Sequence, residues 1–145
     1  MWEVENRMMT DKEVLEFIES KPHSLIVMFG PTKCGKTKTV KSIRSDRKHI
    51  ITSEGFSDFG FMLKRRHTVP EINNIMMTAY QSFDYLVIED IDMTGGALML
   101  IECYVEDFIS EYIDRSTLIL TGVDIFRWKV FRNMYYKNEV IFVTF

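Results

Sequence analysis

The sequence predicts an α/β fold in which helices cover both faces of a five-stranded, mainly parallel sheet. Short apolar runs without polar interruption are typical of strands that are buried on both faces. Segments with helical spacing separate these runs, and 145 residues with 46% hydrophobic content suffice for one core. The five runs are "SLIVMF" (24–29), "HIIT" (49–52), "YLVI" (85–88), "TLIL" (117–120) and "VIFVTF" (140–145).

The segments between these runs carry helix signals. Residues 10–21 place their apolar side chains on one face and end just before Pro22, and a longer helix is expected to begin at Pro70. Residues 97–115 carry an apolar stripe that runs over about five helical turns. Further helices are expected over 36–45, 57–66 and 124–136. We therefore expect a three-layer sandwich at residues 24–145, with residues 1–23 as an N-terminal helical segment that packs on this core.

A glycine-containing loop lies between the first apolar run and the helix that follows it. The stretch "GPTKCGKT" (30–37) matches G-x-x-x-x-G-K-[ST], the pattern of a phosphate-binding loop in P-loop NTPases. Glycine lets several backbone N–H groups point inward, and the helix N-terminus adds positive charge. Lys36 is predicted to reach the β and γ phosphates, and the Thr37 hydroxyl to ligate Mg²⁺. The predicted nucleotide-binding residues are Gly30, Pro31, Thr32, Lys33, Cys34, Gly35, Lys36, Thr37 and Lys38.

Two acids follow the third apolar run directly. In "DYLVIEDID" (84–92), Glu89 and Asp90 are placed at the carboxyl end of a predicted buried strand. Such strand ends are where doubly wound sheets bind ligands, and acids there can hold a metal and orient an attacking water. We assign the metal role to Glu89 and activation of the water to Asp90. The reverse order, or a purely solvated acid pair, remains an alternative.

Four stretches together resemble a known family. "GPTKCGKT", "TSEGF", "YLVIEDID" and "STLILTG" occur in the order and at the spacing of the AAA+ ATPases, most closely the DnaA-like replication initiators and helicase loaders. The resemblance covers about residues 24–145. It implies ATP binding with Mg²⁺, ATP hydrolysis, and a Walker A loop and Walker B pair at the residues named above. It also implies a sensor residue, for which Thr121 is the first candidate and Asp124 the weaker one.

The same resemblance implies an arginine finger and a function in DNA replication. The finger lies on the helix before the last strand, where Arg132 is preferred over Arg127, and a solvated surface arginine is the alternative. Family members continue into a helical lid, whereas this sequence ends at Phe145. We therefore expect a core without a lid and an ATPase that is weak or dependent on a partner. That partner would be a second copy of the chain or a larger replication ATPase.

Charge and composition limit the other partners. A net charge of −3 gives no general attraction to nucleic acid or to anionic membranes. Basic residues nevertheless cluster locally, and Lys64, Arg65 and Arg66 are expected either to contact single-stranded or double-stranded DNA or to form a solvated surface. No apolar run approaches the roughly 20 residues of a membrane span. We expect a protein of the bacterial cytoplasm, or of the host cytoplasm if the protein is viral.

Three other functions are alternatives. A viral superfamily 3 helicase fragment would place a hairpin where this sequence places the long helix at residues 97–115. A small-molecule kinase would need a lid and several arginines between the third and fourth strands. A regulator that binds nucleotide without catalysis, and acts on a larger AAA+ partner, would not need the acid pair.

Overall fold

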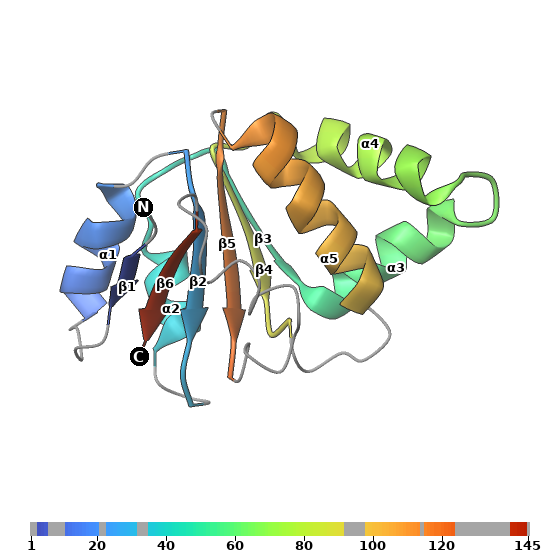
Figure 1. Cartoon of the computed structure of the whole chain (residues 1–145). Helices are drawn as coiled ribbons and strands as arrows, with labels where there is room; N and C mark the ends of the chain where they lie inside the picture. The colour runs from blue at the N-terminus through green and yellow to red at the C-terminus, as the bar shows by residue number, and fades with distance from the viewer. Residues whose placement is uncertain are drawn as a thin grey trace.

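One parallel sheet forms the centre of the molecule. The computed structural model describes residues 3–5, 11–20, 23–31, 35–91, 98–113, 115–123 and 140–144. Within these residues six strands pair in the order β1-β6-β2-β5-β4-β3, and every pairing is parallel (Figure 1). The strands are β1 (Glu3–Glu5), β2 (Leu25–Phe29), β3 (Lys48–Thr52), β4 (Tyr85–Glu89), β5 (Thr117–Gly122) and β6 (Val140–Thr144).

The predicted number of five strands is wrong, because the chain adds a short strand at one edge of the sheet. All five predicted strands are present within a few residues of their expected bounds. The additional strand β1 pairs with β6, with Glu3 opposite Ile141, although the sequence assigns these residues to a helical segment. Three residues with glutamate on both sides of Val4 contain no apolar run, so the pattern of hydrophobicity gives no signal for this strand.

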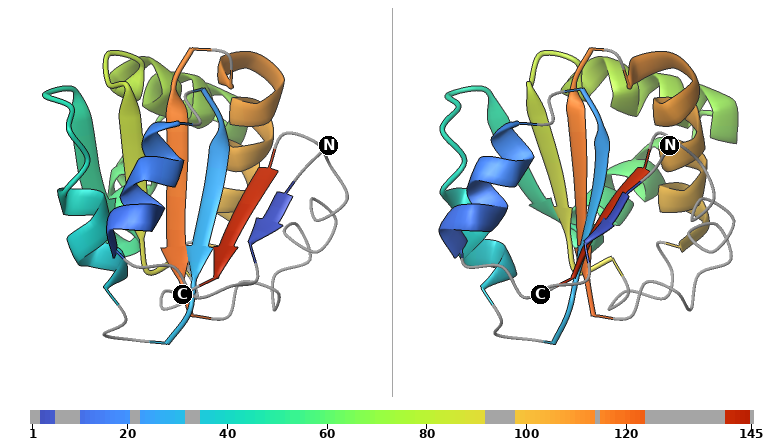
Figure 2. Two further views of the ribbon diagram at one scale, coloured as in Figure 1. Left: turned by 90° about the vertical axis from the view of Figure 1, so that its left-hand side faces the viewer. Right: turned by 60° about the vertical axis from the view of Figure 1, so that its left-hand side comes forward.

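Helices cover both faces of the sheet, which confirms the α/β class and its layers. Alternate residues of the central strands enter opposite cores, because successive side chains of a strand point to opposite faces. Leu25 and Val27 pack in one core, whereas Ile26 and Met28 pack in the other. The two groups of helices lie on opposite sides of the sheet (Figure 2). Helices α3 (Ser53–Leu63), α4 (Val69–Tyr80) and α5 (Leu98–Asp107) cover the first core, and α1 (Asp11–Glu19) and α2 (Lys36–Lys41) cover the second.

The helix expected over residues 97–115 has two parts. The α-helix α5 ends at Asp107 and continues as a π-helical segment, η2 (Phe108–Tyr112). The helix expected over 124–136 lies outside the described residues. Across the part of the chain that the structure describes, the helices are too short or too polar to cross a membrane.

Helix α3 packs through one phenylalanine and three small residues. Its buried residues are Ser53, Phe56, Ser57 and Gly60, so three of four inward positions have little or no side chain. A Cβ atom at Gly60 would lie 2.2 Å from Cδ2 of Leu100 on α5. The Thr52 hydroxyl caps the helix by accepting a hydrogen bond from Gly55 N at 3.0 Å. Close packing at one end and the cap at the other therefore fix the position of α3.

This close approach predicts the effect of adding one methyl group. Gly60→Ala improves helix propensity, but we expect it to lower the free energy of unfolding by about 1–3 kcal/mol, because Leu100 must move. Urea denaturation of the single variants and of the double variant with Leu100→Ala measures this. The double variant is expected to be more stable than the sum of the two single effects. A Gly60→Ala protein as stable as wild type would contradict the packing.

Candidate functional site

The carboxyl ends of three neighbouring strands form the candidate site. Strand β5 lies between β2 and β4, with Thr121 opposite Met28 and Leu120 opposite Ile88. Since neighbouring strands lie about 4.8 Å apart, the loop that follows β2 is about 10 Å from the acids at the end of β4. The strand order therefore brings the predicted phosphate loop, the predicted sensor and the acid pair to one edge of the sheet.

Lys36 is a buried cation at this edge. Its side chain is 7% exposed, and its ammonium donates hydrogen bonds to the carbonyl oxygens of Gly30 at 2.5 Å and Pro31 at 3.1 Å. No carboxylate among the described residues forms an ion pair with it. Burying an ammonium without a negative partner is unfavourable. Two backbone carbonyls thus hold a charge that an anion would neutralise better.

The backbone around Lys36 requires glycine at one position. Gly35 precedes α2 with φ of 98°, in the left-handed region that side chains disfavour, and its carbonyl accepts bonds from both N and Oγ1 of Thr39 at 2.9 and 2.8 Å. Gly30 N donates to Gly122 O at 3.2 Å, which ties the loop to the end of β5. Thr37 and Lys38 are exposed on α2, and the predicted contacts Thr32, Lys33 and Cys34 lie outside the described residues.

Glu89 ends β4 with a buried carboxylate oxygen that lacks a partner. The residue is 8% exposed, and its Oε1 atom accepts no hydrogen bond. A buried oxygen of this kind lowers the stability of the fold unless a cation, a hydrogen-bond donor or a water binds to it. Glu89 is therefore suited to hold a positive ligand at this edge.

Asp90, the next residue, has an exposed side chain and a constrained backbone. Its φ of 57° lies in the left-handed region, which is uncommon for a residue other than glycine. The Thr121 hydroxyl accepts a hydrogen bond from Asp90 N at 3.1 Å, and Ser53 Oγ donates to Asp90 O at 2.9 Å. Thr121 O also accepts from Ile91 N at 2.9 Å. Two nearly fully buried hydroxyls therefore hold the backbone from which the Asp90 carboxylate projects.

Sequence reasoning gave Ser53 no role. Its signal is the sequence "TSEGF", in which a hydroxyl residue follows β3 directly and begins α3. The parallel pairing of β3 with β4 places Thr52 opposite Glu89, so the residue after each strand meets its counterpart. The predicted finger candidates Arg127 and Arg132 and the second sensor candidate Asp124 lie outside the described residues.

These residues fit a polyphosphate with a divalent cation. Lys36 supplies a buried positive charge, and Glu89 supplies an oxygen without a partner. Among the described residues, no three His, Cys, Asp or Glu side chains gather into a metal-binding group. Mg²⁺ commonly binds proteins through one or two carboxylates, with phosphate oxygens and waters as its other ligands. The site could hold Mg²⁺ in this manner, with the exposed Thr37 hydroxyl nearby in the chain.

The fold is similar to that of solved structures of the replication initiator DnaA. Domain III of the Thermotoga maritima replication initiation protein DnaA matches 89% of this chain with a TM-score of 0.65 and 15% sequence identity. The replication initiator DnaA bound to AMPPCP and single-stranded DNA matches 91% at a TM-score of 0.62 and 19% identity. AMPPCP-bound DnaA from Aquifex aeolicus matches 90% of this chain with a TM-score of 0.62 and 14% sequence identity. At these identities the likeness shows a shared fold.

The likeness extends over only part of those proteins. This chain spans 59% of the Thermotoga chain, 43% of the DNA-bound chain and 44% of the Aquifex chain. No protein-family model and no curated protein matches the sequence.

Substitution of Thr121 tests the hydrogen bond that its hydroxyl accepts from Asp90 N. Thr121→Val leaves the Asp90 N–H without its acceptor, so we expect the free energy of unfolding to fall by about 1 kcal/mol. Thr121→Ser retains the hydroxyl and serves as the matched control. Chemical denaturation compares the three proteins. Equal stability of the valine and serine variants would show that this hydroxyl does not hold Asp90.

Proposed function

We propose that this protein binds ATP with Mg²⁺ and hydrolyses it slowly, in DNA replication or a related nucleic-acid transaction. One observation carries this proposal: two buried polar groups occur at the same edge of the sheet. The Lys36 ammonium is held only by backbone carbonyls, and the Glu89 Oε1 atom has no hydrogen-bond partner. An anion would neutralise the Lys36 ammonium, and a cation would bind the Glu89 oxygen. A polyphosphate with bound Mg²⁺ supplies both. The fold likeness to AMPPCP-bound initiators supports ATP as that polyphosphate.

Lys36 binds the phosphates in this proposal. Its ammonium exchanges neutral carbonyl partners for phosphate oxygens, and a charge-assisted bond is about twice as strong as a neutral one. The other contacts come from the loop residues Gly30, Pro31, Thr32, Lys33, Cys34 and Gly35 and from Thr37 and Lys38 on α2. Gly35 is the residue whose left-handed backbone permits the turn.

Glu89 and Thr37 hold the metal, directly or through its waters. When bound, Mg²⁺ neutralises charge on the transferred phosphoryl group. The Glu89 carboxylate is preorganised for this role because its Oε1 atom is already out of water and bonded to nothing. Asp90, which follows it, has an exposed carboxylate and contributes to the metal site through ordered water.

Asp90 accepts the proton of the attacking water. Its side chain is exposed at the strand end, while Ser53 and Thr121 fix its backbone. The Thr121 hydroxyl accepts from Asp90 N, so its own hydrogen is left to donate, and a water at this edge is a suitable acceptor. Thr121 thereby couples the sensor position to the acid.

Assembly completes the site. Arg132, or Arg127, serves as the finger that stabilises transition-state charge in a neighbouring subunit, which is a second copy or a larger replication ATPase. The likeness to an initiator bound to single-stranded DNA supports DNA, single-stranded or double-stranded, as the nucleic-acid partner. Turnover is therefore expected to rise with protein concentration or on addition of DNA.

The Lys36 assignment is tested by nucleotide binding. Lys36→Ala removes the buried charge, so we expect affinity for Mg·ATP to fall about 100-fold. Lys41→Ala, an exposed lysine on the same helix, is the control and is expected to bind like wild type. Isothermal titration calorimetry measures both, and thermal unfolding confirms that each variant is folded. Undiminished affinity in Lys36→Ala would refute the phosphate loop.

The two acids are distinguished by kinetics. Asp90→Asn is expected to bind ATP normally and to lose about 100-fold or more in kcat, as removal of a general base does. Glu89→Gln is expected instead to raise the Mg²⁺ concentration needed for half-maximal turnover. Steady-state phosphate release across a Mg²⁺ series separates these effects. The opposite pattern would exchange the two roles, and normal turnover in both variants would place catalysis elsewhere.

A further inference from the structure

Helix α3 presents large apolar side chains to solvent at its carboxyl end. Phe61 is 47% exposed and Met62 is 69% exposed, and together with Val123 they are the large hydrophobic side chains exposed among the described residues. The inward positions of the same helix hold Phe56 together with the small residues Ser53, Ser57 and Gly60. Two large apolar side chains are therefore left on the outer face, although such residues are usually buried.

Close packing favours this orientation of the helix. A Cβ at Gly60 would lie 2.2 Å from Cδ2 of Leu100, which opposes a rotation that would bring Phe61 to the inner face. Adjacent exposed apolar side chains of this kind are typical of interaction sites.

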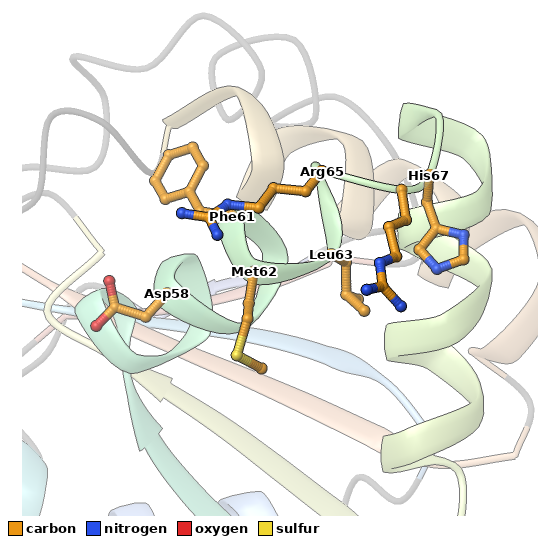
Figure 3. Close-up of a pocket in the computed structure, with 7 residues that line it drawn as sticks. Asp58, Phe61, Met62, Leu63, Arg65 and His67 are labelled. Atoms are coloured by element: carbon orange, nitrogen blue, oxygen red, sulfur yellow. The ribbon is translucent and has the colours of Figure 1, made fainter.

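A cavity of about 670 Å³ lies beside these residues. It is lined by Asp58, Phe61, Met62, Leu63, Arg65, Arg66 and His67 (Figure 3), and we call this surface the α3 surface. It lies at the carboxyl end of α3, whereas the phosphate and acid residues are near the helix's amino end. Phe61 is eight positions beyond Ser53, which corresponds to about 12 Å along the helix. The cavity is therefore separate from the candidate nucleotide site.

The α3 surface carries two arginines and one carboxylate, Asp58, so positive charge predominates. Lys64, Arg65 and Arg66 are exposed, and no carboxylate in the described part of the chain forms an ion pair with them. Arg65 and Phe61 line the same cavity (Figure 3), so a ligand there would meet both a cation and an apolar ring. The surface is complementary to a ligand that presents carboxylates next to apolar side chains.

We propose that the α3 surface docks an amphipathic, acidic helix of a partner protein. The apolar stripe of that helix contacts Phe61, Met62 and Leu63, and its carboxylates pair with Arg65 and Arg66. Methionine is common at such surfaces, because its flexible side chain adapts to the partner's shape. Helix-in-groove recognition of this kind uses anchors at helical spacing.

The shortage of flat rings favours a protein helix over a nucleic-acid strand. Asp58 also lines the cavity, but its carboxylate repels phosphates and glutamates alike and does not distinguish the two ligands. Successive bases need successive flat faces, whereas Phe61 is the one phenyl or indole ring in the lining, and the His67 imidazole already contacts Glu71 at 3.3 Å.

A binding experiment with defined probes tests this proposal. The probes are a synthetic helical peptide with leucine at positions i, i+3, i+4 and i+7 and glutamate beside them, the same peptide with lysine for glutamate, and a single-stranded thymidine oligonucleotide. The methyl resonance of Met62 in ¹³C-methyl-methionine protein, assigned with Met62→Leu, reports occupation of this surface. We expect the acidic peptide to shift that resonance to saturation, and the lysine peptide and oligonucleotide to leave it unchanged.

Variants supply the controls. Two double variants are expected to lower the affinity for the acidic peptide by about tenfold or more. They are Phe61→Ser with Met62→Ser, and Arg65→Glu with Arg66→Glu. Lys41→Glu with Arg44→Glu reverses two exposed charges elsewhere and is expected to have little effect. A Met62 shift caused by the oligonucleotide and absent with the acidic peptide would overturn the proposal in favour of nucleic acid. No shift with any probe, or equal affinity in all variants, would also overturn it.

Discussion

Parallel pairing of β5 with β2 on one side and β4 on the other is the constraint on which the core and the site both depend. In this register Leu120 lies opposite both Val27 and Ile88, so one face of each strand enters the same core. A slip by one residue would turn every side chain of β5 to the wrong face. It would also move Thr121 away from Asp90, whose N–H bonds to its hydroxyl.

The same pairing gives the site its complementary groups. The loop that holds Lys36 is tied to β5 through Gly30 and Gly122, and Asp90 is tied to β5 through Thr121. Each tie uses hydrogen bonds at a strand end that would otherwise be open to solvent. A buried cation and a buried carboxylate oxygen can therefore remain near one another without forming an ion pair. The cost of that arrangement is what a bound ligand would remove.

Helix α3 connects the candidate site to the α3 surface. Its first residue, Ser53, bonds to the Asp90 carbonyl, and its last turn carries Phe61 and Met62. Close packing of Gly60 against Leu100 fixes the helix between these ends.

Much of the fold could be predicted from the sequence, because buried parallel strands are continuous apolar runs and helices have their own period. Strand β1 could not be predicted, since a three-residue edge strand depends on its pairing with β6 and contains no apolar run. In the site, the Lys36 loop and the acid pair have local sequence patterns. Ser53 stands in the local pattern "TSEGF", but that pattern does not show its bond to Asp90, which arises from the pairing of β3 with β4. The close packing of α3 at Gly60 likewise depends on Leu100, far away in the chain.

A crystal structure with AMPPCP and Mg²⁺ is the most direct measurement of the central claim. We expect the phosphates to lie in the loop after β2, with the Lys36 ammonium moved from the Gly30 and Pro31 carbonyls to phosphate oxygens and the metal on the side of Glu89. A structure obtained at saturating nucleotide in which Lys36 still bonds to both carbonyls, with no nucleotide in the loop, would contradict it.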